Sequence, residues 1–273
     1  MDKKNYLQYV KSILPKFIHD LYYELKYPKV KFIGPYKNWK NANQDSTGYK
    51  NQKILNKIIK NTIISSNNNK FYERDGELLS DNNYPKEIIK FINLNYKKKL
   101  KLIDFGGSLG SFFFQNRSKI KAKLIEWIIY EQEYLVNAGL KHIKHKNIHF
   151  IKNIKKLKKF KPDIVLFSSV LEYLEKPKKH INEMLKIKSI KYIIIDRLIV
   201  SNDNDDKIFI QKNPKKYFNM SYPCRIFSKN NFLLNYFKNQ KKIIQGNSYI
   251  GKNFYLNKKK ISYCFFILKT KNL

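Results

Sequence analysis

The distribution of apolar residues changes character near residue 95. From residue 100 onward, short apolar runs alternate with amphipathic stretches, the pattern of a parallel sheet with crossover helices. The runs predict strands at 100–104, 124–130, 148–151, 163–167 and 192–195, and the stretches between and after them predict helices near 110–119, 133–141, 153–159, 178–188 and 229–239. Ser228 is the expected N-cap of the last helix. Two further runs, 242–250 and 261–268, predict an edge hairpin after a polar insertion at 201–227.

Residues 1–95 lack a core strand pattern of their own. Apolar residues at three- and four-residue spacings predict helices over 5–25 and 54–64, and Pro85 begins another that ends near residue 95. Residues 32–50 predict an ordered loop, and 71–79 a short strand or turn. We therefore expect a helical N-terminal extension, 1–95, packed on a domain formed by 96–273.

The chain is strongly basic, with a formal net charge of +35 over 273 residues. Lysine supplies 52 of the 56 basic side chains; the four arginines are Arg74, Arg117, Arg197 and Arg225. Lys, Asn and Ile are all abundant, as AT-rich coding produces, and no nucleic-acid motif accompanies them. The sequence therefore favours compositional drift and predicts no specific nucleic-acid partner. The alternative is attraction to an anionic membrane through the basic amphipathic helix at 5–25.

Cysteine usage and hydropathy indicate a cytoplasmic protein. Cys224 and Cys264 are isolated, no run of apolar residues is long enough to span a bilayer, and the start of the chain lacks a signal-peptide pattern. If the 5–25 helix binds lipid, the protein lies peripherally at the inner membrane face.

A glycine-rich turn follows the first predicted strand. In Asp104-Phe-Gly106-Gly107-Ser108-Leu-Gly110, glycines allow close approach of backbone to a nucleotide-like ligand. The acid precedes the first glycine, whereas NAD sites usually carry theirs one strand later. An acid here suits a ligand with positive charge, such as the sulfonium and ammonium groups of S-adenosylmethionine.

Polar side chains recur where later strands end. Glu131, Ser168 and Asp196 follow or close three of them, and Glu131 is placed to accept both hydroxyls of a ribose. Ligands in open α/β sheets bind beyond these strand ends.

Five blocks in this order resemble class I S-adenosylmethionine-dependent methyltransferases: LIDFGGSLGSFFFQNR (102–117), WIIYEQ (127–132), PDIVLFSSVLEYLEKP (162–177), YIIIDR (192–197) and SYPCRIFS (221–228). The resemblance extends to a bacterial subfamily of methyltransferases found among surface-polysaccharide genes. The N-terminal extension, with GPYKNW at 34–39, also resembles this subfamily. It implies a Rossmann-like, mostly parallel seven-stranded sheet that ends in a C-terminal antiparallel hairpin.

The resemblance also implies roles for residues that match its motifs. The cofactor-binding set would be Asp104, Gly106, Gly107, Ser108, Gly110, Glu131, Gln132, Asn153, Ser168 and Ser169. Ser108 stands where many such enzymes have a second glycine. Asn153 would meet the adenine amine, and Ser168 and Ser169 would line the methyl-transfer side.

An oxygen acceptor benefits from a base, and the candidates at the strand ends are Asp196, Glu172 and Tyr173. Arg197, Tyr222 and Arg225 would bind the acceptor, with structural ion pairing as the alternative role of the arginines. The expected activity is methylation of an oxygen or nitrogen of a small or saccharide acceptor such as a surface-glycan precursor. The alternative is a catalytically inactive basic module of the same fold that attaches to anionic membrane or nucleic acid.

One cluster of aspartates and one of histidines do not match the spacing of a metal site. Asp203, Asp205 and Asp206 lack the full calcium-loop spacing and fit a solvated loop. The histidines of KHIKHKNIH (141–149) are separated by a helix break.

Overall fold

The computed structural model describes residues 30–48, 51–80, 83–213, 220–250 and 253–271. The chain forms two compact units, one of residues 1–49 with 209–223 and one of residues 50–208 with 224–273. The helix predicted over 5–25 lies outside the described residues. Residues 51–95 lie in the same unit as the central sheet, so the two units do not divide at residue 95.

The first unit contains a strand and a helix where the sequence predicted a loop. β1 (Lys31–Tyr36) precedes α3 (Trp39–Gln44), and Asn38 caps that helix by accepting a hydrogen bond from the Asn41 N–H at 2.9 Å. β1 begins the strand order β1-β9-β10, an edge place that tolerates Pro35 because no ladder donor is needed there. The predicted loop at 32–50 was therefore wrong for most of its length.

The polar insertion predicted at 201–227 holds two strands. β9 (Lys207–Lys212) and β10 (Ser221–Ser228) lie within it or at its end, and the first unit takes β9 from Phe209 and β10 as far as Pro223. β9 has a central apolar run of three residues, Ile208 to Ile210, which is too short to predict a strand between the acidic run before it and the polar residues after it.

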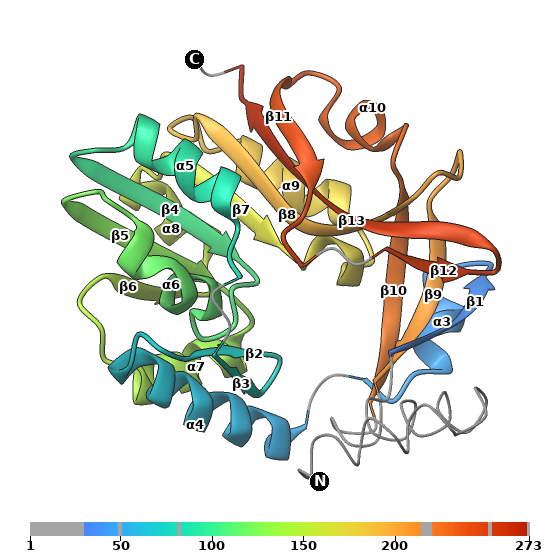
Figure 1. Ribbon diagram of the computed structural model, residues 1–273, viewed down its shortest axis with the longest axis horizontal. Coiled ribbons are helices and arrows are strands. Elements are labelled where there is room, and N and C mark those ends of the chain that lie inside the picture. Colours follow the sequence, from blue (N-terminus) through green and yellow to red (C-terminus); the bar gives the residue numbers. More distant parts are fainter. Residues whose placement is uncertain (1–29, 49–50, 81–82, 214–219, 251–252, 272–273) are drawn as a thin grey trace, which may run out of the picture. The chain divides into compact units, whose positions relative to one another are not determined.

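The second unit is built on a mostly parallel sheet, as predicted (Figure 1). Its parallel strands are β4 (Lys99–Phe105), β5 (Leu124–Tyr130), β6 (Ile148–Ile151), β7 (Ile164–Ser168) and β8 (Tyr192–Ser201). They lie in the order β6-β5-β4-β7-β8, so the order reverses beside β4, as it does in Rossmann-like folds.

Antiparallel strands continue the sheet beyond β8. β13 (Lys259–Lys269) pairs with β8, and β11 (Lys241–Asn247) and β12 (Phe254–Leu256) pair with β13. The end of β10 pairs in parallel with the end of β8, through Phe227 and Ser228. Seven strands were expected in the sheet. Within the described residues of this unit, the sheet also contains β12 and the end of β10.

Helices cover both faces of this sheet (Figure 1). They are α4 (Gln52–Asn67), α5 (Lys86–Asn95), α6 (Ser111–Asn116), α7 (Glu133–His142), α8 (Ile154–Phe160), α9 (Pro177–Leu185) and α10 (Phe232–Phe237), with short 3-10 turns η1 (Arg117–Lys119) and η2 (Leu171–Tyr173). A small hairpin, β2 (Tyr72–Arg74) and β3 (Glu77–Leu79), occupies the segment predicted as strand or turn.

The last helix begins later than predicted. Ser228 ends β10, and its Oγ accepts a hydrogen bond from Asn231 N at 3.2 Å, so Asn231 and not Ser228 is the N-cap of α10.

Successive strand residues point to opposite faces, which gives the sheet two cores. Ile103, Val165 and Ile193 belong to a core with Leu157 of α8 and Met184 of α9. On the other face, Phe112 of α6 stacks on Trp127 with ring centroids 5.9 Å apart, and the tilted ring of Phe113 contacts it with centroids 5.5 Å apart. Asp104 lies on this second face, beside Trp127.

Candidate active site

The glycine turn follows β4 at the carboxyl edge of the sheet. Its backbone is left-handed at Gly106 (φ 71°), Ser108 (φ 53°) and Gly110 (φ 99°), a region that glycine enters without steric cost. The Gly106 N–H donates to Tyr130 O at 2.9 Å, which ties the turn to the end of β5. A Cβ on Gly106 would lie 2.4 Å from Val170 Cγ2, so the turn also approaches the loop after β7 too closely for any side chain.

Asp104 lies directly beneath this turn. Its side chain is 1% exposed, and its Oδ2 accepts a hydrogen bond from Trp127 Nε1 at 3.0 Å. A Cβ on Gly107 would lie 2.4 Å from the Asp104 carboxyl carbon, so only glycine allows the turn to close over the acid. Burial raises the pKa of Asp104 to about 6, although the bond from Trp127 acts to lower it.

Glu131 reaches the turn from the end of β5. Its Oε1 accepts from the Ser108 N–H at 3.3 Å and its Oε2 from the Gln132 N–H at 2.7 Å. Burial raises the pKa of Glu131 to about 7, and the two backbone bonds offset part of that rise. The structure thus brings Asp104, Glu131 and the glycine turn together as the sequence predicted.

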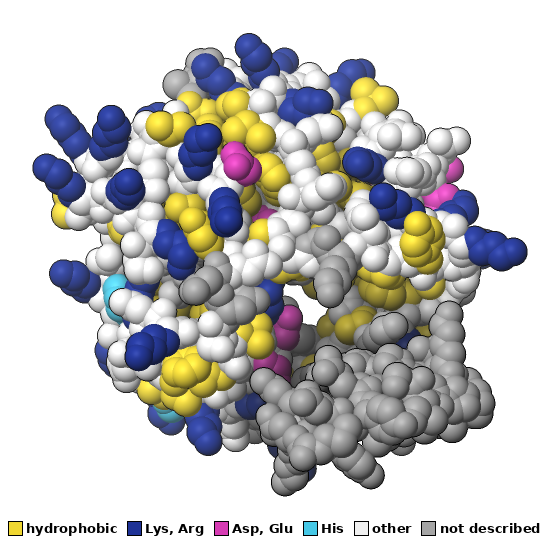
Figure 2. All heavy atoms as spheres, in the orientation of Figure 1, with side chains coloured by type: hydrophobic (Ala, Val, Ile, Leu, Met, Phe, Trp, Pro, Cys, Tyr) yellow, Lys and Arg dark blue, Asp and Glu magenta, His cyan; other side chains and the backbone are white. Residues whose placement is uncertain are grey.

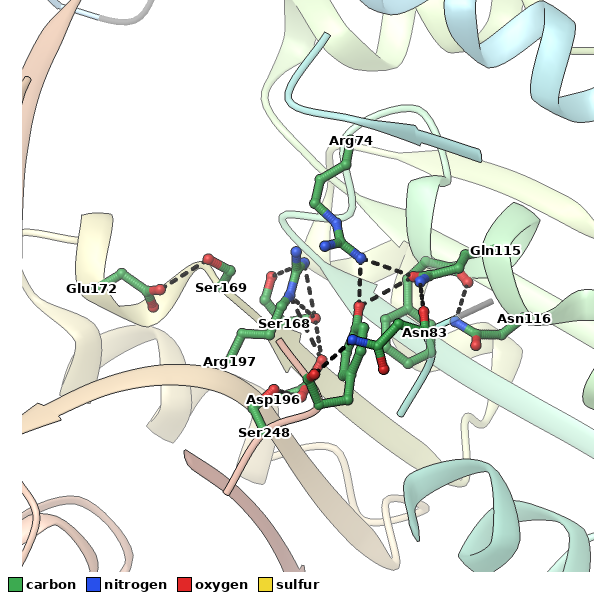
Figure 3. Close-up of polar contacts among 12 residues, drawn as sticks. Arg74, Asn83, Gln115, Asn116, Ser168, Ser169, Glu172, Asp196, Arg197 and Ser248 are labelled. Atoms are coloured by element: carbon green, nitrogen blue, oxygen red, sulfur yellow. Dashed lines mark hydrogen bonds and ion pairs between the residues drawn. The ribbon is translucent and has the colours of Figure 1, made fainter. Parts of the chain in front are cut away.

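A second network joins β7 and β8 at the same edge (Figure 3). Ser168 pairs in register with Asp196, and its Oγ donates to Asp196 Oδ2 at 3.1 Å. Ser248 Oγ donates to the other carboxylate oxygen at 3.0 Å. Burial raises the pKa of Asp196, while Arg197 and the two serines act to lower it.

Arg197 adopts a left-handed backbone (φ 57°), which is uncommon for a residue with a side chain. Its Nε and Nη2 donate to Ser168 Oγ at 3.2 and 3.1 Å, and its Nε lies 3.6 Å from Asp196 Oδ2. Strained backbone of this kind occurs where the surrounding structure fixes a side chain in one place.

Glu172 is fully buried in η2, behind the loop after β7. Its Oε1 accepts from Ser169 Oγ at 3.0 Å, and its Oε2 has no hydrogen-bond partner among the described residues. Burial raises the pKa of Glu172 to about 7. Tyr173 follows it, half-buried, and its N–H donates to Val170 O at 3.1 Å.

Sequence reasoning missed a cluster centred on Tyr249. Arg74 Nη2 donates to the Tyr249 hydroxyl at 2.6 Å, and that hydroxyl donates to Gln115 Oε1 at 3.2 Å. Asn83 Nδ2 donates to Tyr249 O at 2.8 Å (Figure 3 shows Arg74, Gln115 and Asn83). The contacts join residues up to 175 positions apart, so no local motif records them; the rarity of arginine was the one available clue.

Glu73 was also missed. It is 1% exposed, accepts a hydrogen bond from the Gly76 N–H at 2.7 Å and another from the Ser111 hydroxyl at the start of α6. Burial raises its pKa to about 7. The β2–β3 hairpin is thereby fastened to the helix that follows the glycine turn.

Buried carboxyls therefore outnumber their cationic partners in this part of the molecule. They are Glu73, Asp104, Glu172 and Asp196, and Glu131 beside them is half-buried. Among the described residues, the one ion pair that they make is between Asp196 and Arg197. Because unpaired buried charge is costly, these acids suit a ligand that brings positive charge.

Four other predicted site residues have side-chain surroundings of their own. Gln132 is exposed at the start of α7, and Asn153 caps α8 by accepting from the Lys155 N–H at 2.8 Å. Arg225 Nη2 donates to Glu175 O at 3.1 Å. Tyr222 belongs to the first unit, where its hydroxyl accepts hydrogen bonds from the side chains of Gln211 and Asn213 at 3.1 and 3.2 Å.

Two acids of the run at 203–206 contact other residues of the chain. Asp203 pairs with Lys207 at 3.2 Å and with Lys259, and Asp206 accepts from the Ser228 N–H at 2.9 Å. Within the described ranges, no group of three or more His, Cys, Asp or Glu side chains is placed to hold a metal ion. No helix of the described residues is long and apolar enough to cross a membrane.

Comparisons with known proteins add a distant structural likeness. No protein-family model matches the sequence, and no curated protein sequence does. Among solved structures, a putative type 11 methyltransferase from Sulfolobus solfataricus is similar to this chain at 16% sequence identity. The match covers 70% of this chain and 94% of the other chain, with a TM-score of 0.43. A methyltransferase from Methanosarcina mazei, described as SAM-dependent, is 12% identical over 65% of this chain and 95% of its own, with a TM-score of 0.44.

A third similar structure contains a ligand. The 1,6-didemethyltoxoflavin-N1-methyltransferase of Burkholderia thailandensis, solved with its substrate and S-adenosylhomocysteine, is 9% identical over 68% of this chain and 77% of its own, with a TM-score of 0.40. Values this low decide neither function nor cofactor by themselves, so the functional conclusion rests on the site of this chain.

Proposed function

We propose that the protein is an S-adenosylmethionine-dependent methyltransferase that acts on an oxygen or nitrogen of a small or saccharide acceptor, such as a surface-glycan precursor. The observation that carries the proposal is the contact between Glu131 and the Ser108 N–H, which sets a carboxylate against a glycine turn at the carboxyl edge of a parallel sheet.

The residues around this turn fit the cofactor. Glu131 would accept the ribose hydroxyls, and the glycine turn leaves its backbone open to a close ligand. Asp104 and Glu131, which form no ion pair within the described part of the chain, would supply negative charge for a sulfonium and an ammonium group. When bound, S-adenosylmethionine supplies an electrophilic methyl group for transfer by in-line displacement.

On the acceptor side, two buried acids differ in what they can do. Both carboxylate oxygens of Asp196 already accept hydrogen bonds from serine hydroxyls, which suits a positioning role. Glu172 keeps one oxygen without a partner among the described residues and has a pKa of about 7, which suits transient uptake of an acceptor proton. Arg197 would orient an acceptor that carries negative charge.

Calorimetric titration with S-adenosylmethionine, S-adenosylhomocysteine and NADH tests the cofactor. We expect micromolar binding of the first two and none of NADH. Glu131→Gln should weaken binding at least about tenfold, because the amide accepts hydrogen bonds less strongly than the carboxylate. Glu133→Gln is the matched control, since Glu133 is exposed and pairs with Lys152. Equal affinity of the Glu131→Gln and Glu133→Gln proteins would refute the assignment.

Methyl transfer from labelled cofactor to a panel of nucleotide sugars and sugar phosphates tests the activity. Glu172→Gln should lower kcat about 10²- to 10⁴-fold on an oxygen acceptor without changing cofactor affinity. An unchanged kcat would remove Glu172 from the chemistry. Cofactor binding with no transfer to any acceptor of the panel would contradict the saccharide class.

A further inference from the structure

Exposed lysines gather at the amino-terminal ends of the parallel strands, the edge of the sheet opposite the candidate site. Each of the turns that enter β4, β5, β6, β7 and β8 carries two or three of them: Lys97, Lys98, Lys99, Lys121, Lys123, Lys144, Lys146, Lys158, Lys159, Lys161, Lys186, Lys188 and Lys191. The acids described at this edge are Glu126 and Asp163, which pair with Lys99 at 2.9 Å and with Lys191 at 3.2 Å. We call this set the basic edge.

Backbone hydrogen bonds join these turns into one continuous surface. Lys123 N donates to Lys97 O at 3.1 Å, which links the entries to β4 and β5. Lys191 N donates to Asp163 O at 2.8 Å, which links the entries to β7 and β8. The lysines are therefore neighbours in space although the sequence separates them.

The carboxyl edge of the same strands carries lysines in some places only. The turns at 106–110, 131–133 and 169–173 contain none, whereas Lys152 follows β6, and Lys176, Lys178 and Lys179 lie at the start of α9. At the amino-terminal edge, by contrast, the entry to each of the five strands carries two or three lysines. Figure 2 shows dark-blue side chains along the left and upper-left rim, where β4 and β5 begin in Figure 1.

Exposed leucines lie among these lysines. Leu94 in the last turn of α5, Leu124 at the start of β5 and Leu140 in the last turn of α7 are 67%, 62% and 53% exposed. The Asn93 side chain donates to Lys119 O at 2.9 Å and accepts from Lys121 N at 2.8 Å, which holds the end of α5 against the entry to β5. Apolar and basic side chains are thus interleaved on one surface.

We propose that the basic edge docks on an anionic lipid surface, with its lysines against the headgroups and Leu94, Leu124 and Leu140 in the interface. Lysine is a hydrated point charge that attracts anionic headgroups without requiring bidentate geometry. Interleaved leucines add affinity only where an apolar phase lies below the charge. Arg117, the one arginine near this edge, is engaged by Asn69 Oδ1 at 2.9 Å and Ser65 O at 3.2 Å. The proposal does not depend on the methyltransferase assignment.

Flotation of the full-length protein with vesicles tests the proposal. Vesicles of phosphatidylcholine alone, which carry no net charge, are compared with vesicles containing about one third phosphatidylglycerol. The anionic lipid of the second kind attracts lysines that lie near the vesicle surface. The edge variant replaces Lys97, Lys98, Lys121 and Lys123 by Gln. The control variant replaces Lys53, Lys60, Lys70 and Lys86, which are exposed elsewhere in the same unit. Both variants lose the same charge, so a difference between them reports position.

We expect binding to the anionic vesicles alone, loss of that binding in high salt, and at least a tenfold weakening in the edge variant only. Equal binding by the two variants, or binding that survives in the edge variant, would overturn the proposal. A second variant, Leu94→Ser with Leu124→Ser, separates a membrane from a nucleic acid. It should weaken vesicle binding and leave binding to a 20-nucleotide RNA unchanged; RNA binding without vesicle binding would also overturn the proposal.

Discussion

Gly106 provides the sharpest test of how the glycine turn is built. Gly106→Ala places a methyl group 2.4 Å from Val170 Cγ2 while the backbone stays left-handed. The left-handed conformation costs a residue with a Cβ about 1–2 kcal/mol, and overpacking against Val170 adds about 1–3 kcal/mol. We therefore expect the free energy of unfolding to fall by about 2–5 kcal/mol.

Two comparisons separate these contributions. Gly48 is also left-handed (φ 82°), but a Cβ added there would meet no atom within 4 Å, so Gly48→Ala should cost about 1–2 kcal/mol from the backbone alone. Val170→Ala in the Gly106→Ala background should recover about 1–3 kcal/mol, because it removes the contact that the new methyl group makes.

Urea unfolding, followed by far-UV circular dichroism, gives the free energy of unfolding of the unchanged protein, Gly106→Ala, Gly48→Ala and the double variant Gly106→Ala with Val170→Ala. Titration with S-adenosylhomocysteine measures whether the turn still binds this ligand. If Gly106→Ala costs no more than Gly48→Ala, the close approach to Val170 does not constrain the turn. If Val170→Ala adds its own loss without any recovery, the assumed steric contact is refuted.

Two further predictions concern charge in the site. Glu172 has its pKa raised from 4.5 to about 7 by burial, so the folded protein holds this proton more tightly than the unfolded chain, and stability should fall as pH rises from about 4.5 to 7. Glu172→Gln should flatten that part of the profile of Tm against pH, and an unchanged slope would contradict the raised pKa. Arg74→Ala should cost about 1–3 kcal/mol because the hydroxyl of the half-buried Tyr249 loses its donor. Hydrogen exchange should then quicken at 71–83 and 248–250, whereas quickening spread evenly over the sheet would point to global destabilisation.

The sequence predicted the parallel core because its strands have a strong local pattern. Leu102 and Ile103 in one strand and Trp127 to Ile129 in the next are apolar and buried on both faces, and an acid follows each run within two residues. Asp104 and Glu131 could be predicted for the same reason, because strand ends place side chains at a common edge. β9 and β10 were missed because neither KIFIQK nor SYPCRIFS alternates apolar and polar residues, and Pro223 lies inside β10.

The second half of the site depends on contacts that no spacing records. Arg74, Gln115 and Tyr249 meet only after the hairpin, α6 and the loop after β11 have packed together. The gathering of lysines at the five strand entries was equally hidden, because along the sequence the lysines alternate with the strands. It emerges only when five separate turns align at one edge of a sheet.

The two cysteines have a practical consequence for studying the protein. Cys224 and Cys264 are 0% and 3% exposed, and burial raises the pKa of both thiols. Reagents that attack thiolates should therefore spare both in the native state. A cysteine introduced at an exposed position such as Lys98 or Leu124 can then be labelled with a polarity-sensitive fluorophore. The two native cysteines need not be removed first, because they do not react under native conditions.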